Sequence, residues 1–212
     1  MPVKKDSVPK EEGNPNKTFQ LFSFKKLSQH LLKLQKKELY IEIYVLSRIY
    51  YKNFNQHRAT THFKMFRKFF TLLKRIDEMK LKQFSKELLS RFYNSKSQKK
   101  VKESWTHLPD PEFLKYSLIK LTGAYHLIQA TFEAIPPVYN GFNLLVQKID
   151  FVALSLAVLA SISRIHCLLK TLRKDLVISL NLVTSLAEYY KTPIKLPKKY
   201  NLITFSKLEI EE

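Results

Sequence analysis

The sequence predicts an all-α fold, an antiparallel helical bundle of about four to five helices with flexible termini. Three observations favour this class. Only 3 of the 212 residues are glycine, whereas folds with many strands need many tight turns. Apolar residues recur at three- and four-residue steps, which is the spacing of one helix face. The hydrophobic fraction of 45% is high enough to form a buried core.

Three parts are expected along the chain. Residues 1–18 are polar, contain three prolines and read as a flexible leader. Residues 19–190 form the helical bundle domain. Residues 191–212 form a tail that Pro193 and Pro197 keep extended, which suits docking on a partner.

The first helix is predicted from about Phe24 to Lys52, because leucines and isoleucines recur along one stripe of this segment. A short connector is predicted at residues 53–56, since asparagine favours turns and helix caps. A second helix follows from about His57 to Glu78.

The remaining helices are predicted from similar signals. A third helix covers about residues 81–93, and an irregular basic segment follows over 95–110. A fourth helix begins at Asp110-Pro111-Glu112, where a cap, a first-turn proline and a carboxylate follow one another. It is expected to stop at Pro136-Pro137. The last helical region covers about residues 142–190, with a break near Lys174.

The net charge of +19, from 37 Lys and Arg against 18 Asp and Glu, indicates a polyanionic partner. Nucleic acid is the commonest such partner, an anionic membrane surface is the second, and a basic protein without either partner is the third alternative. One cysteine excludes an intrachain disulfide and fits the cytosol or nucleus. The apolar run at 151–163 is shorter than the roughly 20 residues that cross a bilayer, so we interpret it as a buried core helix.

The segment from residue 52 to residue 75 combines aromatic residues with cations and contains no Asp or Glu. On a helix, Ala59, Phe63, Phe66, Phe70 and Leu73 share one side, and the cations occupy the other. A basic face is often only a solvated face, but solvated helices usually mix charges to gain ion pairs. We therefore predict that this helix and its connector contact the backbone and bases of an RNA. The predicted contact residues are Lys52, Asn53, Asn55, Gln56, His57, Arg58, Lys64, Arg67, Lys68 and Arg75.

A second basic group follows the most apolar run of the chain. Its members, predicted as a secondary RNA-contacting site or alternatively as a solvated surface, are Arg164, Lys170, Arg173 and Lys174.

The motif NQHRA at 55–59 is followed by an aromatic and basic helical pattern. This segment and two later stretches resemble the RNase MRP-specific small subunit family and the related N-terminal domain of the nucleolus and neural progenitor protein. The specific one is LSRIYYKNFNQHRATTHFKMFRKFFTLLKRI at 46–76, which contains NQHRA at 55–59. The others are LPDPEFLKYSLIKLTGAYHLI at 108–128 and FVALSLAVLASISRIHCLLKTL at 151–172. The resemblance implies a helical, non-catalytic subunit of a nucleolar ribonucleoprotein endoribonuclease that processes precursor rRNA. Its partners would be the RNase MRP RNA and other protein subunits.

The sequence offers little sign of an enzyme or a metal site. It contains no CxxC, HExxH or glycine-rich phosphate loop. On one helix, His57 and His62 would point about 140° apart and could not share a metal. We expect no catalytic residue, cofactor or membrane partner. The alternative function is a protein-binding or membrane-surface helical adaptor without RNA contact.

Overall fold

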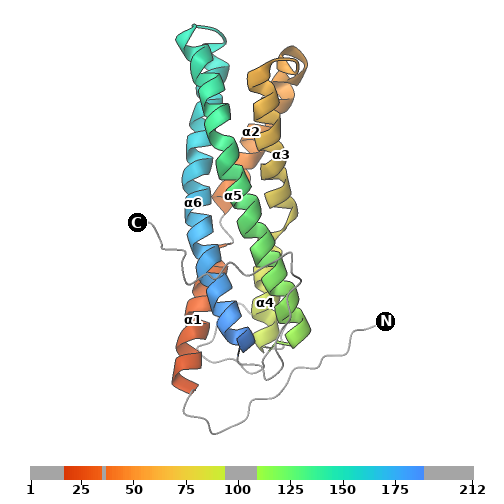
Figure 1. Cartoon of the computed structure of the whole chain (residues 1–212), viewed down its shortest axis with the longest axis vertical. Coiled ribbons are helices and arrows are strands. Elements are labelled where there is room, and N and C mark those ends of the chain that lie inside the picture. The colour runs from red at the N-terminus through yellow and green to blue at the C-terminus, as the bar shows by residue number, and fades with distance from the viewer. Residues whose placement is uncertain (1–16, 35–36, 94–108, 189–212) are drawn as a thin grey trace, which may run out of the picture. The chain divides into compact units, whose positions relative to one another are not determined.

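The computed structural model describes residues 17–34, 37–93 and 109–188 (Figure 1). These described residues form α-helices and no strand, so the predicted all-helical class is confirmed. The described part contains six helices, and the segment predicted as the first helix includes parts of two of them, one ending at Lys33 and the next beginning at Lys37. The helices are α1 (Lys17–Lys33), α2 (Lys37–His57), α3 (Thr61–Glu78), α4 (Leu81–Tyr93), α5 (Pro111–Gln147) and α6 (Val152–Glu188).

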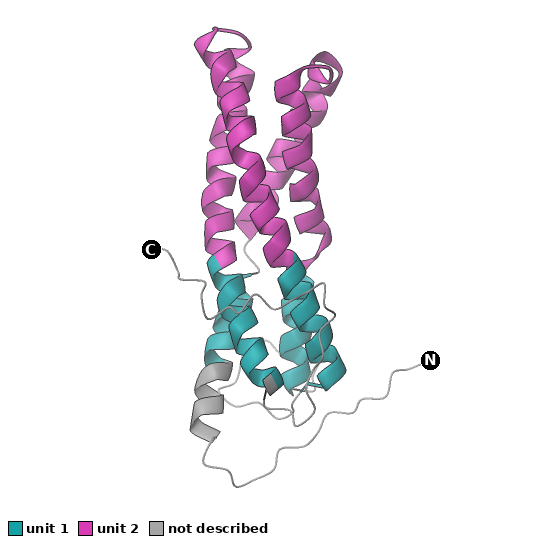
Figure 2. Ribbon diagram, viewed as in Figure 1, with its two compact units in different colours: residues 1–35, 81–123, 174–212 teal, residues 36–80, 124–173 magenta. Residues whose placement is uncertain are grey.

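The helices belong to two compact units (Figure 2). Unit 1 contains α1, α4, the part of α5 up to Gly123 and the part of α6 from Lys174. Unit 2 contains α2, α3 and the remaining parts of α5 and α6. The predicted domain boundaries stay predictions. The tail at 191–212 and nearly all of the predicted leader and of the irregular segment at 95–110 lie outside the described residues.

Aromatic side chains fill the core of unit 2. The Tyr50 ring of α2 stacks on two rings of α3, with centroid distances of 5.2 Å to Phe63 and 4.7 Å to Phe70. Phe66 of α3 contacts Phe142 of α5 edge to face at 5.6 Å. The predicted apolar side of α3 is therefore confirmed for Phe63, Phe66, Phe70 and Leu73, which are all buried. Ala59 was wrongly placed with them, because it lies exposed in the turn before α3.

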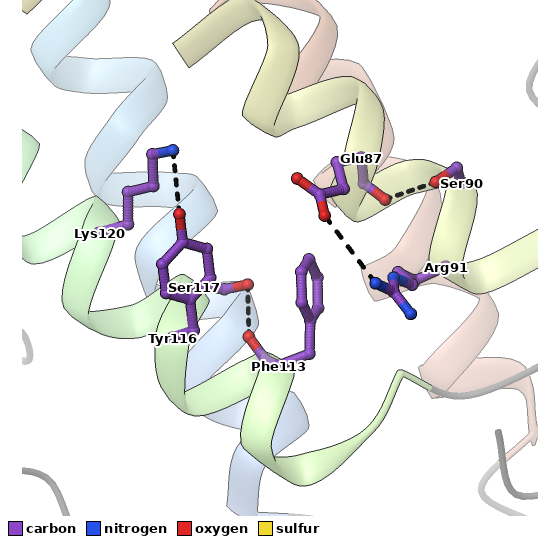
Figure 3. A network of polar contacts seen from close by, with 7 residues as sticks. All are labelled: Glu87, Ser90, Arg91, Phe113, Tyr116, Ser117 and Lys120. Carbon is purple, nitrogen blue, oxygen red and sulfur yellow. Dashed lines mark hydrogen bonds and ion pairs between the residues drawn. The ribbon is translucent and has the colours of Figure 1, made fainter. Parts of the chain in front are cut away.

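Unit 1 is held by polar and cation–aromatic contacts as well as by leucines. The Nδ1 atom of His30 in α1 lies 2.9 Å from Oδ1 of the buried Asp175 in α6. Figure 3 shows side chains of α4 and α5, with dashed lines for the polar contacts within each helix. The Arg91 guanidinium of α4 lies 4.9 Å from the Phe113 ring, and its NH2 atom lies 3.9 Å from Glu87. Such contacts let cations cover aromatic surface at a helix interface while their charged ends stay in water.

The start of α5 confirms one prediction, and its course corrects another. The helix begins at Pro111, and the Leu114 amide donates to the Asp110 carbonyl at 3.0 Å. It does not stop at Pro136-Pro137 but continues to Gln147, so the stop predicted at these prolines is wrong. Both prolines are exposed, so the carbonyls that lose an amide partner are near solvent, while Val138 on the other face is buried.

Gly141, in the same part of α5, permits a close approach to α3. A Cβ atom at this position would lie 3.1 Å from Cβ and 3.4 Å from Cα of His62. The absence of a side chain therefore lets the two helices come close at this point.

The α6 helix is continuous from Val152 to Glu188, so the predicted break near Lys174 is wrong. One face of its apolar start packs in the core through Val158 and Ile162, whereas Leu156 on another face is 52% exposed. The interpretation of this run as a buried helix is therefore right for one face only. Over Val152–Ala187, α6 passes a length-and-composition test for a membrane span, a test that core helices of soluble proteins also pass.

The turn between α5 and α6 contains two residues in the left-handed region, Ile149 with φ of 62° and Phe151 with φ of 45°. The Ile149 amide donates to the Val146 carbonyl, and the Asp150 amide donates to the Leu145 carbonyl. This pair of bonds is the Schellman arrangement, which usually has glycine at the left-handed position. A β-branched residue at that position stores strain, of about 1–2 kcal/mol.

Candidate nucleic-acid interface

The turn between α2 and α3 is displaced from the predicted connector. Residues 53–56 belong to the last turns of α2, and the chain reverses between His57 and Thr61. The Thr60 hydroxyl donates to the His57 carbonyl at 2.6 Å, and the Thr60 amide donates to the same carbonyl at 2.9 Å. Thr60 thus closes the end of α2, which explains why its side chain makes no capping bond to α3.

His57 is a correction to the predicted contact set. His57 is only 3% exposed, because it is the last residue of α2 and lies on the side of the helix that faces the core. The His57 ring lies 4.6 Å from the Phe151 ring, edge to face, and 6.0 Å from the Phe63 ring. Its Nε2 atom is buried without a hydrogen-bond partner among the described residues. The imidazole is therefore part of the packing between two turns of unit 2 and does not present a surface to RNA.

The reversal at Thr60 brings His62 near His57, with ring centroids 6.0 Å apart. The sequence analysis expected the two imidazoles to point about 140° apart on one helix. This expectation is wrong, because His57 ends α2 and His62 belongs to α3. Partial burial, and secondarily the neighbouring His57, lower the pKa of His62 below its ordinary value. No group of three or more His, Cys, Asp or Glu side chains suited to a metal occurs in residues 17–34, 37–93 and 109–188.

The outer face of α3 carries exposed cations. Lys64 and Lys68 lie one turn apart, and Arg75 lies about 17 Å along the axis from Lys64 at 1.5 Å per residue. Within the described part of the chain, these cations make no ion pair with a carboxylate. The predicted exposure is confirmed for Lys64, Arg67, Lys68 and Arg75.

The end of α2 adds polar groups with mixed exposure. Lys52, Asn55, Gln56 and the following Arg58 are exposed, as a surface contact requires. Asn53 is half-buried, and its Nδ2 atom donates to the Ile49 carbonyl at 2.8 Å. The side-chain amide nitrogen of Asn53 therefore already donates a hydrogen bond within its own helix.

Three residues near this surface, Lys74, Tyr51 and Arg48, lie outside the predicted contact set. Lys74 donates from Nζ to the Tyr51 hydroxyl and lies 5.0 Å from the centre of the Tyr51 ring and of the Phe70 ring. The contact with Lys74 joins Tyr51 of α2 to α3. Tyr51 is still 60% exposed, so part of its ring faces solvent. Arg48 is also exposed and precedes Lys52 by one turn. Helical spacing from Lys52 was the signal that would have identified Arg48.

The predicted secondary basic group stays a prediction, and two of its members already have side-chain partners. Arg164 bonds from Nε to Oε1 of Glu42 at 3.0 Å, so part of its charge is neutralised. Arg173 donates to Gln129 and lies over the Phe132 ring at 5.2 Å. Lys170 is exposed, and Lys174 belongs to unit 1, whereas the other three residues belong to unit 2.

The exposed residues provide donors for anionic oxygen atoms. Ammonium and guanidinium groups bind phosphates through charge-assisted hydrogen bonds, and guanidinium groups can do so with two parallel bonds. The rigid support of α3 by the aromatic core fixes the spacing of these groups.

Comparison with families of known proteins gives a match over most of the chain. The family model described as nucleolus and neural progenitor protein, N-terminal, matches residues 10–181, which is most of the chain. No curated protein matches the chain, and no solved structure matches it.

Proposed function

The chain belongs to the family of the N-terminal domain of the nucleolus and neural progenitor protein, and we propose that it is an RNA-binding subunit of a nucleolar ribonucleoprotein. More specifically, we propose that the particle is RNase MRP, which processes precursor rRNA. In this role the chain is not a catalyst. It binds the RNase MRP RNA and neighbouring protein subunits and holds them in place.

The exposed basic face of α3 is the observation that supports this proposal. Lys64, Arg67, Lys68 and Arg75 stand opposite a fully buried aromatic side of the same helix. The core therefore fixes the helix, and the cations remain available to phosphates. The family name supports a nucleolar location, where a protein of net charge +19 would meet abundant RNA.

The salt dependence of RNA binding tests the basic face. We expect the triple variant Lys64→Gln, Lys68→Gln and Arg75→Gln to bind folded RNase MRP RNA more weakly. If each cation contacts one phosphate, the slope of log affinity against log salt falls by about 2–3 units.

A matched control separates local contact from net charge. The variant Lys86→Gln, Lys115→Gln and Lys148→Gln loses the same charge from exposed positions outside the basic face. It should keep a slope close to that of the unmodified chain. Equal slopes for the two triple variants would contradict the assignment of the site to α3.

Arg58→Ala tests the turn separately. Its side chain is exposed, so the circular dichroism spectrum should be unchanged while RNA association weakens in a gel-shift titration. Unchanged RNA affinity would remove Arg58 from the proposed site.

A membrane-surface adaptor is the second candidate function, and the apolar composition of α6 is the observation in its favour. Vesicles that contain anionic lipid, compared with folded RNA at the same salt concentration, distinguish the two. Tight vesicle binding with no specific RNA binding would favour the adaptor.

A further inference from the structure

Unit 2 has an open groove between α2 and α6, with a volume of about 640 Å³. Ile49 of α2 contributes apolar surface to it, and Leu154 and Ala157 of α6 contribute more. Arg48 and Lys52 of α2 also line this groove. It thus combines an apolar lining with cations, whereas the exposed face of α3 consists mainly of cations.

The apolar surface continues along both helices. On α2, Val45 and Ile41 precede Ile49 by one and two turns and are 40% and 57% exposed. On α6, the exposed Ala160 lies between Ala157 and Arg164. Because Arg164 bonds to Glu42, α2 and α6 remain adjacent over this length. We call the surface formed by Ile41, Val45, Ile49, Leu154, Ala157 and Ala160 the α2–α6 groove.

The charges beside the middle of the α2–α6 groove are positive, and exposed carboxylates lie only near its ends, with Glu38 one turn before Ile41 and Asp150 one turn before Leu154. Arg48 and Lys52 are exposed on α2, and Arg164 lies on α6. The sequence contains no Asp or Glu in residues 43–76 or 151–174. The carboxylate of Glu42 is already bonded to Arg164. A partner with acidic side chains would supply the missing negative charge, and a basic partner would be repelled.

We propose that the α2–α6 groove docks an acidic amphipathic helix of a partner protein. The surface from Ile41 to Lys52 is about 17 Å long at 1.5 Å per residue, which equals three helical turns. A helix of this length presents apolar residues at steps of three and four to such a groove and acidic residues to its rim. The small side chains of Ala157 and Ala160 leave room for its backbone.

Other occupants fit less well. RNA would place phosphates and sugars against exposed Ile41 and Val45, whose apolar surface it does not cover efficiently. A symmetric contact between two copies would bring two sets of Arg48 and Lys52 to one interface, where Glu38 is the one exposed carboxylate of α2 that could offset them. The inference goes beyond the proposed RNA contact, and it rests on the proposed function only if the partner belongs to the same particle.

Site-specific cross-linking in the full chain tests the occupant. A benzophenone amino acid replaces Val45 or Ala157, and the cross-linked segment is identified by mass spectrometry from cells. Both positions should cross-link to the same protein segment, with apolar residues at helical spacing and Asp or Glu beside them. A matched probe at Lys64 on α3 should not reach this segment. RNA, lipid, a second copy, a non-acidic segment or no product at both groove positions would overturn the proposal.

A substitution in the α2–α6 groove then distinguishes partner binding by this groove from RNA binding by the basic face of α3. Ala157→Trp fills the groove from an exposed position without changing the charge, so we expect the fold and the RNA salt slope to be retained. Recovery of the mapped partner should fall by about tenfold or more, whereas Ala157→Ser should keep it. The triple variant at Lys64, Lys68 and Arg75 should show the reverse pattern. If Ala157→Trp left partner recovery unchanged, or lowered RNA and partner binding together, the proposal would be wrong.

Discussion

Phe66 provides the most direct test of the arrangement of unit 2, because its ring joins three helices. It is 0% exposed and contacts the rings of Tyr50 at 5.7 Å, Phe63 at 5.4 Å and Phe142 at 5.6 Å, each edge to face. Full burial of the side chain contributes about 2–3 kcal/mol. Three aromatic contacts add about 0.5–1.5 kcal/mol each. After partial relaxation around the cavity, Phe66→Ala should lower the free energy of unfolding by about 4–5 kcal/mol.

Urea unfolding followed by far-ultraviolet circular dichroism measures this loss. The midpoint should fall while the slope of free energy against urea stays unchanged, since the native state keeps its extent of burial. Met65→Ala is the matched control, because Met65 is the adjacent residue of α3 and is 37% exposed. Its cost should be below about 1 kcal/mol. A loss below 1 kcal/mol for Phe66→Ala, or a larger loss for Met65→Ala, would show that the two faces of α3 are reversed.

Four further changes have defined outcomes in the same unfolding assay. His30→Ala leaves the buried Asp175 carboxylate without its partner and should cost about 3 kcal/mol, and a cost near zero would mean that water replaces the imidazole. Gly141→Val forces side-chain atoms against His62 and should cost about 1–3 kcal/mol, whereas a gain would show that α5 shifts freely. Ile149→Gly removes the strain at a positive φ and should raise stability by about 1 kcal/mol, unless the 82% exposed side chain has an unexpected packing role. Because the pKa of His62 is lowered, its contribution to stability is present above pH 6.5 and is lost as the pH falls below that value, so His62→Gln should flatten the pH dependence in this range.

The features of the fold that depend on local sequence could be predicted. The start of α5 follows from Asp110, Pro111 and Glu112, whose preferences all apply within one turn. The two faces of α3 follow from residue spacing alone, and Phe63 and Lys68 lie on the expected sides. These predictions needed no knowledge of neighbouring helices.

The stop predicted at Pro136-Pro137 failed because packing outweighed local preference. Ala134, Val138 and Phe142 are buried on one side of α5, and their burial favours a helix across the prolines. Proline removes an amide donor, but this loss is tolerated where the freed carbonyl remains near solvent. Sequence spacing does not reveal which side of the helix the prolines occupy relative to the core until the neighbours are known.

The position of His57 could not be predicted for a similar reason. Asn53, Asn55 and Gln56 suggested a connector, but they form the last turns of α2. The actual turn depends on the Thr60 hydroxyl and on the contact between His57 and Phe151, which is distant in sequence. The cations of α3 were found because their exposure depends only on the period of the helix.

The discontinuous composition of unit 1 has a consequence for synthesis on the ribosome. His30 and Asp175 are 145 residues apart, so α1 emerges long before the segment of α6 that it contacts. At about 5–20 residues per second, this delay is roughly 7–30 s. The segments of unit 2 end at Arg173, and the first of them begins only at Lys36. The nascent chain can therefore bring unit 2 together first, while the side of α1 that contacts α6 remains exposed and can bind a chaperone.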